Sequence, residues 1–408
     1  MVYLPQRRRQ GRQRSLKAHF NDLPRLRYDR LLFLIVLGIG LSWSAISILK
    51  WLLPSAPPAA SDAVSEVSQE ALADTYTVKS PPDWRANPDL QAIVDETVAL
   101  AEDKGLPTEA LSITLVDVTD PATHYRAGYN HQMLRFPASV SKLFWLAAFF
   151  NQVRTGSIPD ESPFHDDLNQ MIRISDNDSA SRIVDAITRT TSGETLGEAE
   201  LERWIDERRR IDTLFRNANY DNILLSMKNY PVTDLGEAPE GRDLQLKQTP
   251  ALADGNQVST DQAARLMYEI YTKQAVSPLA STKMAHLLTR DLNPSAWDQS
   301  DRDFVKGFLG ESLPADIYFA SKVGYTSRSR QEVIFVRTLD DRAIYILAIF
   351  ATDPAYAQDE EIFPQMSRHI FDRLNGTSQK LKPKEVSVMK RNRQYTLRAA
   401  LLNRRLPS

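Results

Sequence analysis

FPASVSKLFWLAAFF, residues 136–150, is the most informative stretch of this chain. Its apolar side chains surround the whole helical circumference after Lys142, which is typical of a helix buried on all sides. Ser139 and Lys142 lie three residues apart, so one helical turn places both on the same face. A desolvated lysine has a lowered pKa and can then withdraw the proton of a serine hydroxyl. The backbone N–H groups at the start of this helix could stabilise an oxyanion.

Two further segments carry candidate chemistry. Ser175, Asp176 and Asn177 interrupt a helical stretch over residues 170–190. They could be ordinary helix caps, or Ser175 could pass a proton to a leaving group while Asn177 holds the lysine and a substrate amide. Lys322, Val323 and Gly324 end a predicted strand over 317–323, where a lysine can attract a carboxylate and a glycine permits close approach.

Each segment alone is a weak signal. Ser47 and Lys50 also fit the pattern S-x-x-K, inside an apolar run where they cannot be catalytic. Serine and asparagine are common helix caps, and a lysine on a strand is common in any sheet. The argument for a catalytic site therefore depends on the three segments together and on their order in the chain.

In this order, the segments resemble the S-x-x-K, S-D-N and K-T-G signatures of class A β-lactamases and penicillin-binding proteins. The Phe-Pro-Ala before Ser139, the Met-Ile before Ser175 and the stretch QVSTDQAARLM resemble the same family, over residues 89–374. The resemblance implies an acylated nucleophile (Ser139), its base (Lys142), a proton shuttle (Ser175), substrate contacts (Asn177, Lys322, Gly324), and an oxyanion hole formed by the backbone N–H groups of Ser139 and Tyr325.

The chain departs from this pattern in its spacing and at one residue of the third signature. The gap from Ser139 to Ser175 is short, so we expect part of the helical subdomain to be trimmed. The gap from Ser175 to Lys322 is long and contains the polar stretch 226–256, which we interpret as an insertion. Val323 replaces a Thr or Ser whose hydroxyl would bind a substrate carboxylate. Thr326, Ser327 or Arg330 could compensate.

A further departure concerns the release of the acyl group. By the resemblance, class A β-lactamases activate the deacylating water with a Glu in an E-x-x-L-N loop, and no such motif stands between Ser175 and Lys322. Glu237 and Glu240 are the nearest candidates for this base, and Asp221 is a weaker one. The sequence therefore supports acylation better than fast hydrolysis of β-lactams.

The pattern of elements predicts an α+β fold, in which an antiparallel sheet with flanking helices joins a helical subdomain, similar to serine β-lactamases and DD-peptidases. Apolar residues at helical spacing predict a helix from residue 89 to Gly105, and a capping box predicts another from Ser259 to Lys273. The remaining expected elements are a hairpin of strands 111–118 and 124–130, strands 317–323, 332–338 and 343–350, and a closing helix 362–374.

The region before this domain predicts a membrane anchor. Residues 1–30 contain nine Lys or Arg against two Asp, and residues 31–49 carry no formal charge. We predict a cytoplasmic basic N-terminus (1–30), one transmembrane helix (31–53) and a Pro/Ala/Ser linker (54–88), with everything after the span on the extracytoplasmic side. Two alternatives for 31–53 fit less well. A buried helix of this length would show polar positions on one face, and a cleaved signal peptide would continue into a small-residue cleavage site, whereas Lys50 and Trp51 follow here.

The predicted domain, residues 89–375, is followed by a basic tail, 376–408, with nine Lys or Arg against one Glu. The tail is either a solvated extension or an attachment to an anionic membrane or cell-wall surface. The net charge of −2 gives no attraction to nucleic acid, and the chain has no Cys. Its six His lack metal-site spacing, so we expect no metal and no other cofactor.

Together these features predict a membrane-anchored serine acyl-hydrolase that acts on a β-lactam or a D-Ala-peptide-like amide of a peptidoglycan-like substrate. The alternative is a binding protein of the cell envelope that keeps the fold without turnover. Val323 and the missing Glu loop favour this alternative, whereas the intact Ser139–Lys142 and Ser175–Asn177 pairs count against it.

Overall fold

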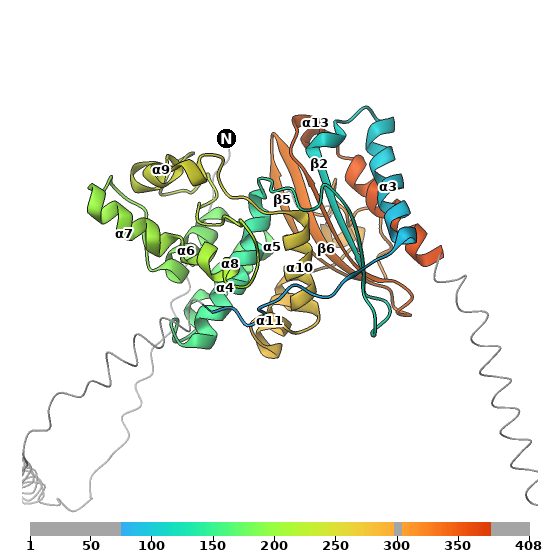
Figure 1. The fold of residues 1–408 in the computed structure, drawn as a ribbon, viewed down its shortest axis with the longest axis horizontal. Helices are drawn as coiled ribbons and strands as arrows, with labels where there is room; N and C mark the ends of the chain where they lie inside the picture. Colours follow the sequence, from blue (N-terminus) through green and yellow to red (C-terminus); the bar gives the residue numbers. More distant parts are fainter. Residues whose placement is uncertain (1–74, 298–303, 377–408) are drawn as a thin grey trace, which may run out of the picture. The chain divides into compact units, whose positions relative to one another are not determined.

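The computed structural model describes residues 75–297 and 304–376. They form an α+β fold with a sheet in the order β1-β3-β2-β7-β6-β5-β4, in which only β1 and β3 are parallel (Figure 1). The early strand β2 pairs with the late strand β7, as a fold with strands at both ends of the domain requires. The strands are β1 (Arg85–Ala86), β2 (Leu111–Asp117), β3 (Tyr125–Tyr129), β4 (Thr289–Arg290), β5 (Tyr318–Thr326), β6 (Ser329–Arg337) and β7 (Ile344–Ala351).

The helices cover both faces of the sheet and build a separate helical part beside it (Figure 1). They are α3 (Pro88–Asp103), α4 (Ser141–Thr155), α5 (His165–Arg173), α6 (Asn177–Thr188), α7 (Glu198–Arg208), α8 (Arg210–Arg216), α9 (Gly241–Lys247), α10 (Thr260–Tyr271), α11 (Pro278–Leu288), α12 (Pro294–Trp297), α13 (Pro354–Gln358) and a last helix at 362–376. Single 3-10 turns occur at η1 (Thr108–Ala110), η2 (Ala138–Val140), η3 (Ser162–Phe164) and η4 (Pro250–Leu252).

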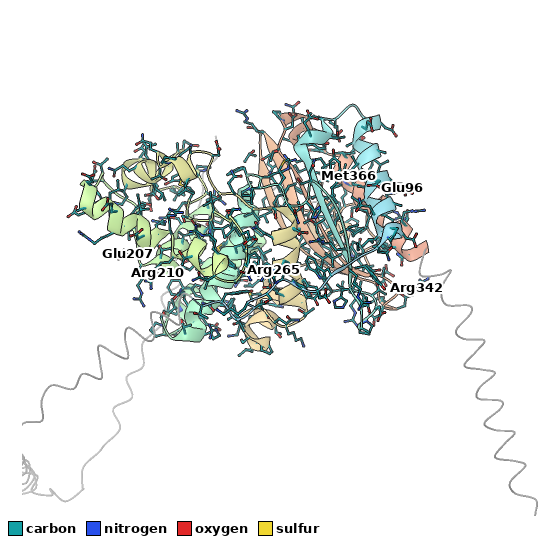
Figure 2. The ribbon with its side chains drawn as sticks, in the orientation of Figure 1. Glu96, Glu207, Arg210, Arg265, Arg342 and Met366 are labelled. Atoms are coloured by element: carbon teal, nitrogen blue, oxygen red, sulfur yellow. The ribbon has the colours of Figure 1, made fainter. Side chains whose placement is uncertain are left out.

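Strand β6 shows why both faces of the sheet are covered. Side chains alternate along a strand, and Val333 and Phe335 belong to the apolar cluster on the α10 side. Ile334 and Val336 belong to the cluster on the opposite side, which includes residues of α3 and of the last helix. Met366 of that helix is fully buried there and lies over the sheet in Figure 2.

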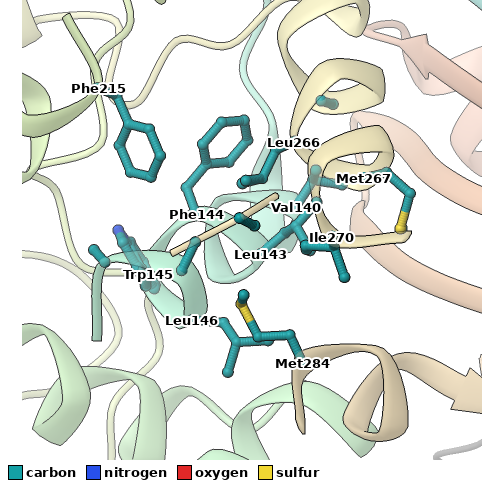
Figure 3. Close-up of a cluster of buried hydrophobic side chains, with 14 of the residues drawn as sticks. Val140, Leu143, Phe144, Trp145, Leu146, Phe215, Leu266, Met267, Ile270 and Met284 are labelled. Carbon is teal, nitrogen blue, oxygen red and sulfur yellow. The ribbon is translucent and has the colours of Figure 1, made fainter. Parts of the chain in front are cut away.

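Helix α4 lies at the centre of the larger apolar cluster. Leu143, Phe144, Trp145 and Leu146 are all fully buried, against α10, α11 and residue Phe215 of α8 (Figure 3). A helix surrounded in this way keeps a fixed position, because protein interiors are close-packed and tolerate little movement. The predicted buried helix at 137–150 is therefore confirmed, with its first turn wound as η2.

The other predicted elements are also confirmed. Helix α3 ends before Gly105, which has the positive φ of 72° that favours glycine. Ser259 and Gln262 form the predicted capping box of α10. The predicted interruption at residues 175–177 is shorter in the structure: α6 begins at Asn177, because the side chain of Asp176 accepts a hydrogen bond from the backbone N–H of Ser179 and so caps the helix.

The predicted linker is part of the folded unit from residue 75 onward. Tyr76 is fully buried, and its hydroxyl donates to the carboxylate of Glu269 at 2.9 Å. Strand β1 then pairs with β3. The predicted span 31–53 and the tail after Gly376 lie outside the described residues, and none of the described helices is long and apolar enough to cross a membrane.

Candidate active site

Ser139 lies in η2, the tight turn that leads into α4. Ala138 before it has a positive φ of 45°, and the hydroxyl of Ser141 donates to the Ala138 carbonyl at 2.9 Å. Strand β5 passes this turn closely: a Cβ added to Gly324 would lie 2.5 Å from the carbonyl oxygen of Pro137 and 3.1 Å from the backbone nitrogen of Ser139. Only glycine permits this approach, which brings the backbone around Tyr325 next to Ser139.

Lys142 is fully buried directly beside the serine. Its Nζ lies 3.1 Å from Ser139 Oγ, 2.5 Å from the carbonyl oxygen of Ser175 and 2.6 Å from Asn177 Oδ1. Burial lowers the pKa of Lys142 to about 7, against a smaller opposing effect of the Asp176 carboxylate. A neutral amine has two N–H donors and one lone pair. The two strong acceptors take the two N–H groups, so the lone pair is left to receive the Ser139 proton.

The interrupted helix supplies the next two groups. Helix α5 ends at Arg173 and α6 begins at Asn177, and Ser175 between them has a positive φ of 57°. This conformation is uncommon for a residue with a side chain and is a frequent feature of functional sites. Ser175 Oγ lies 3.4 Å from the Lys142 nitrogen, and the Asn177 amide nitrogen donates to the carbonyl of Pro231 at 3.0 Å.

Lys322 reaches the same serine from β5. Its Nζ donates to Ser175 Oγ at 3.0 Å and to its neighbour's carbonyl, Val323 O, at 2.9 Å. Burial lowers the pKa of Lys322 well below its usual range, and the positive charge of Lys142 lowers it further. Ser175 therefore connects the two lysines, and a proton taken up by Lys142 can pass through this hydroxyl to a leaving group.

The departure at Val323 has a structural counterpart. Its side chain is buried in the apolar cluster on the α3 face of the sheet, away from Lys322 and Gly324. Arg330 does not compensate, because its guanidinium is buried and donates to the carbonyls of Tyr356, Gly307 and Ala357. Thr326 does line the cleft, with its hydroxyl hydrogen-bonded to Ser329, whereas Ser327 is exposed and does not line it.

A cleft of about 320 Å³ opens over Ser139. The side of the cleft nearest the serine is formed by Phe136, Ala138, Asn177, Tyr325 and Thr326. The facing wall comes from the polar stretch 226–256. The sequence predicts this stretch to be an insertion, and Glu237 and Glu240 are the only residues of it that we expect at the site. Its lining residues are Met227, Lys228, Asn229, Tyr230, Pro239, Lys247, Ala253, Asp254, Gly255 and Asn256.

Side-chain amides attach this wall to η2, the turn that contains Ser139 (the nucleophile turn), and join two segments of the wall to each other. Asn229 donates to the Ala138 carbonyl at 3.3 Å and to the Ser141 hydroxyl at 3.1 Å. Asn256 exchanges two hydrogen bonds with the backbone of Met227. Nothing in the sequence distinguishes these asparagines from those of an ordinary polar loop, because their partners are backbone groups and a serine far away in the chain.

A buried group of charges holds the wall to the helical part. Arg208 of α7 is fully buried, with Asp185 at 3.1 Å and Asp243 at 3.9 Å from its guanidinium. Lys228 donates to Asp185 at 2.8 Å and to Ser192 at 2.9 Å. We refer to Asp185, Arg208, Lys228 and Asp243 as the wall ion cluster. The cluster joins α6, α7 and α9 to the segment around Lys228, which lines the cleft.

The candidate deacylation bases lie elsewhere. No carboxylate between residues 215 and 245, all of which the structure describes, lines the cleft over Ser139. Asp221 lines a cavity beside Trp84 and Arg126, and Glu240 lines a small one beside Asp243. Glu237 is exposed. Asp254 is the one carboxylate among the lining residues, and it is exposed as well.

A profile of the β-lactamase enzyme family matches residues 159–374, more than half of the chain. The chain therefore belongs to this family. The match includes Ser175, Asn177 and Lys322 and begins after Ser139 and Lys142. No curated protein matches the chain.

Several solved structures are similar to this chain. A β-lactamase from Sphaerobacter thermophilus DSM 20745 is 17% identical, with 72% of this chain and 98% of that chain covered and a TM-score of 0.47. PBP-A is 18% identical, with 74% and 100% covered and a TM-score of 0.46. The TLA-3 extended-spectrum β-lactamase is 10% identical, with 70% and 98% covered and a TM-score of 0.50, which is a likeness of fold alone.

Proposed function

We propose that the chain is a serine acyl-hydrolase that forms an acyl-enzyme on Ser139 with a β-lactam or a D-Ala-peptide-like amide. The observation that carries the proposal is the buried Lys142 amine at 3.1 Å from Ser139 Oγ, with two acceptors, Ser175 O and Asn177 Oδ1, closer to the same nitrogen. In the reaction, Ser139 Oγ bonds to the carbonyl carbon while its proton passes to Lys142. The carbon–nitrogen bond then breaks, and Ser175 delivers a proton to the leaving nitrogen.

We further propose that the acyl-enzyme is long-lived. Hydrolysis of the ester needs a base that activates water, and Asp254, the one carboxylate that lines the cleft among the described residues, is exposed on the facing wall. The proposed reaction is therefore closer to that of a penicillin-binding protein than to that of a fast β-lactamase.

The location of the enzyme is also part of the proposal. The uncharged run 31–49 after a basic segment supports a single-pass anchor with the catalytic domain outside the cytoplasm, where peptidoglycan-like substrates occur. Protease treatment of intact cells tests this topology. We expect the catalytic domain to be cleaved only when the outer surface of the cytoplasmic membrane is accessible, and cleavage only in lysed cells would refute it.

Covalent labelling with a fluorescent penicillin tests the chemistry. The full chain in detergent is the right sample, because a fragment that starts at residue 85 would lose the buried Tyr76. We expect label on the native protein and on Ser295→Ala, an exposed serine outside the cleft, and none on Ser139→Ala. We also expect the label to persist for hours.

Loss of the label within seconds would instead indicate a β-lactamase with a base that the cleft does not reveal. A second candidate is a non-catalytic binding protein, favoured by the buried Val323 and by the lack of a placed carboxylate. Reversible penicillin binding without covalent label would support it and would contradict the acyl-hydrolase.

A further inference from the structure

The charges that line the cleft over Ser139 are few. Three lining side chains are charged: Lys228, Lys247 and Asp254. Lys228 is already paired with Asp185 in the wall ion cluster. Lys247 and Asp254 are exposed, and neither side chain makes a hydrogen bond or ion pair with any described residue, including each other. Their charges are therefore available to a ligand.

Both charges belong to the wall that faces β5. Lys247 is the last residue of α9, and Asp254 follows η4. The neighbour of Asp254, Gly255, lies against Phe136, because a Cβ added to this glycine would be 3.6 Å from the aromatic ring. Phe136 is three residues before Ser139, so the backbone next to Asp254 lies against the segment that leads into η2.

The β5 side of the cleft offers little to a charged group of a substrate. Val323 is buried in the apolar cluster and has no hydroxyl. The Arg330 guanidinium is engaged with three carbonyl groups, and the Thr326 hydroxyl is shared with Ser329. Apart from the buried lysines, the side chains that can bind a charged group of a substrate therefore lie on the opposite wall.

On the basis of the proposed function, we infer that the cleft selects substrates whose end away from the reacting carbonyl is zwitterionic. The ammonium group of this amino-acid end contacts Asp254 and its carboxylate contacts Lys247. Lys247 and Asp254 form no ion pair with each other, and a ligand that carries both complementary charges satisfies both. A ligand with one charge leaves the other side chain without a partner.

The exposure of Lys247 and Asp254 determines how large the preference for the zwitterionic substrate should be. Pairs between exposed charges are weak and screened by salt, so each contact changes the acylation rate about three- to fivefold and both together about tenfold. The preference decreases at high salt for the same reason.

Four amide substrates that differ only at this end test the inference. One is zwitterionic, one has its amine acetylated, one has its carboxylate amidated, and one has both groups blocked. The readout is the acylation rate of Ser139 in the full chain, measured in competition with fluorescent penicillin. We expect the zwitterionic compound to react about tenfold faster than the fully blocked one.

Charge exchange identifies the residues. Lys247→Glu and Asp254→Lys should each abolish the preference. The double variant carries both charges again with their positions exchanged, and it should recover part of the preference. Lys273→Glu, an exposed lysine outside the cleft, is the matched control and should keep the preference.

The outcomes separate this inference from the function on which it rests. Equal rates for all four amides, or a preference that survives Lys247→Glu, overturn the inference while penicillin labelling of Ser139 still supports the function. A change in label loss alone in Asp254→Lys would mean that Asp254 acts on water rather than on substrate, which also overturns it. No acylation by penicillin or by any of the amides overturns both.

Discussion

The two sides of the cleft over Ser139 are built differently. The reacting side consists of groups on or beside regular elements: η2, α4, the α5–α6 junction and β5. The facing wall consists of loops, the short helix α9 and the turn η4 between residues 226 and 256, attached by amide side chains and by the wall ion cluster. The reacting side holds Lys142 and Lys322, both of lowered pKa, near the hydroxyl of Ser175. The facing wall carries the exposed side chains of Lys247 and Asp254. Chemistry and selectivity can therefore change independently in this molecule.

The largest effect should come from the reacting side. We expect Lys142→Ala to lower the acylation rate by about a thousandfold, because Ser139 Oγ then has no base within hydrogen-bond reach in the part of the chain that the structure describes. Stopped-flow labelling with fluorescent penicillin measures it, with Lys273→Ala as the control. A decrease of less than tenfold would mean that another group takes the serine proton.

The wall should respond in stability. We expect Arg208→Met to lower the free energy of unfolding by about 3 kcal/mol, since it leaves Asp243 buried without a cation at short range. Urea denaturation of the native protein and the variant provides the measurement. Arg337→Met, which removes an exposed pair with Asp341, should cost less than about 1 kcal/mol. Equal losses in the two variants would show that the wall ion cluster contributes no more than a surface pair.

The pH dependence sharpens the contrast further. In the proposed reaction the reactive form of Lys142 is the neutral amine, and burial lowers the pKa of this lysine to about 7. The acylation rate should therefore rise with pH, about tenfold per unit below 7, and level off above it. Labelling rates from pH 5 to 9, corrected with Ser139→Ala, give the profile. A flat profile across this range would contradict a base of this pKa.

The smallest effect concerns the segment that leads into the domain. Tyr76 and Tyr220 both donate to Glu269, which also accepts from Arg265. Tyr76→Phe removes one of these bonds to a buried carboxylate and should cost about 1.5 kcal/mol of unfolding free energy. In Tyr125→Phe, where the hydroxyl has no hydrogen bond to a described residue, we expect a change within about 0.5 kcal/mol. Thermal unfolding of both variants decides whether Tyr76 belongs to the folded unit.

The sequence was informative about the reacting side because its groups are close in the chain or lie within strongly patterned segments. Ser139 and Lys142 are one turn apart in an apolar helix, and Ser175 and Asn177 interrupt another. Period and composition predict such elements, and helix geometry then predicts which side chains can meet. The contact of Gly324 with the nucleophile turn could be expected only through the family resemblance.

The wall could not be predicted in the same way. Asn229 and Asn256 are bonded to backbone groups that no residue type reveals, and Arg208 meets Asp243 only because α7 and α9 pack together. The boundary of the linker was missed for a related reason. Pro81 and Pro82 are typical of unfolded segments, yet the single aromatic side chain of Tyr76 fills a pocket between distant helices.

The pairing of β2 with β7 has a consequence for how the chain acquires its structure. Leu111 is paired with Ala351, so the middle of the sheet cannot form until nearly all of the domain has been synthesised. Contacts between segments so distant in sequence form slowly, because a long loop must close first. Gly324, which lies against the Ser139 turn, is on β5 and is therefore also synthesised late. Shortened products of translation that end before β5 would carry Ser139 and Lys142 but lack Lys322 and Gly324.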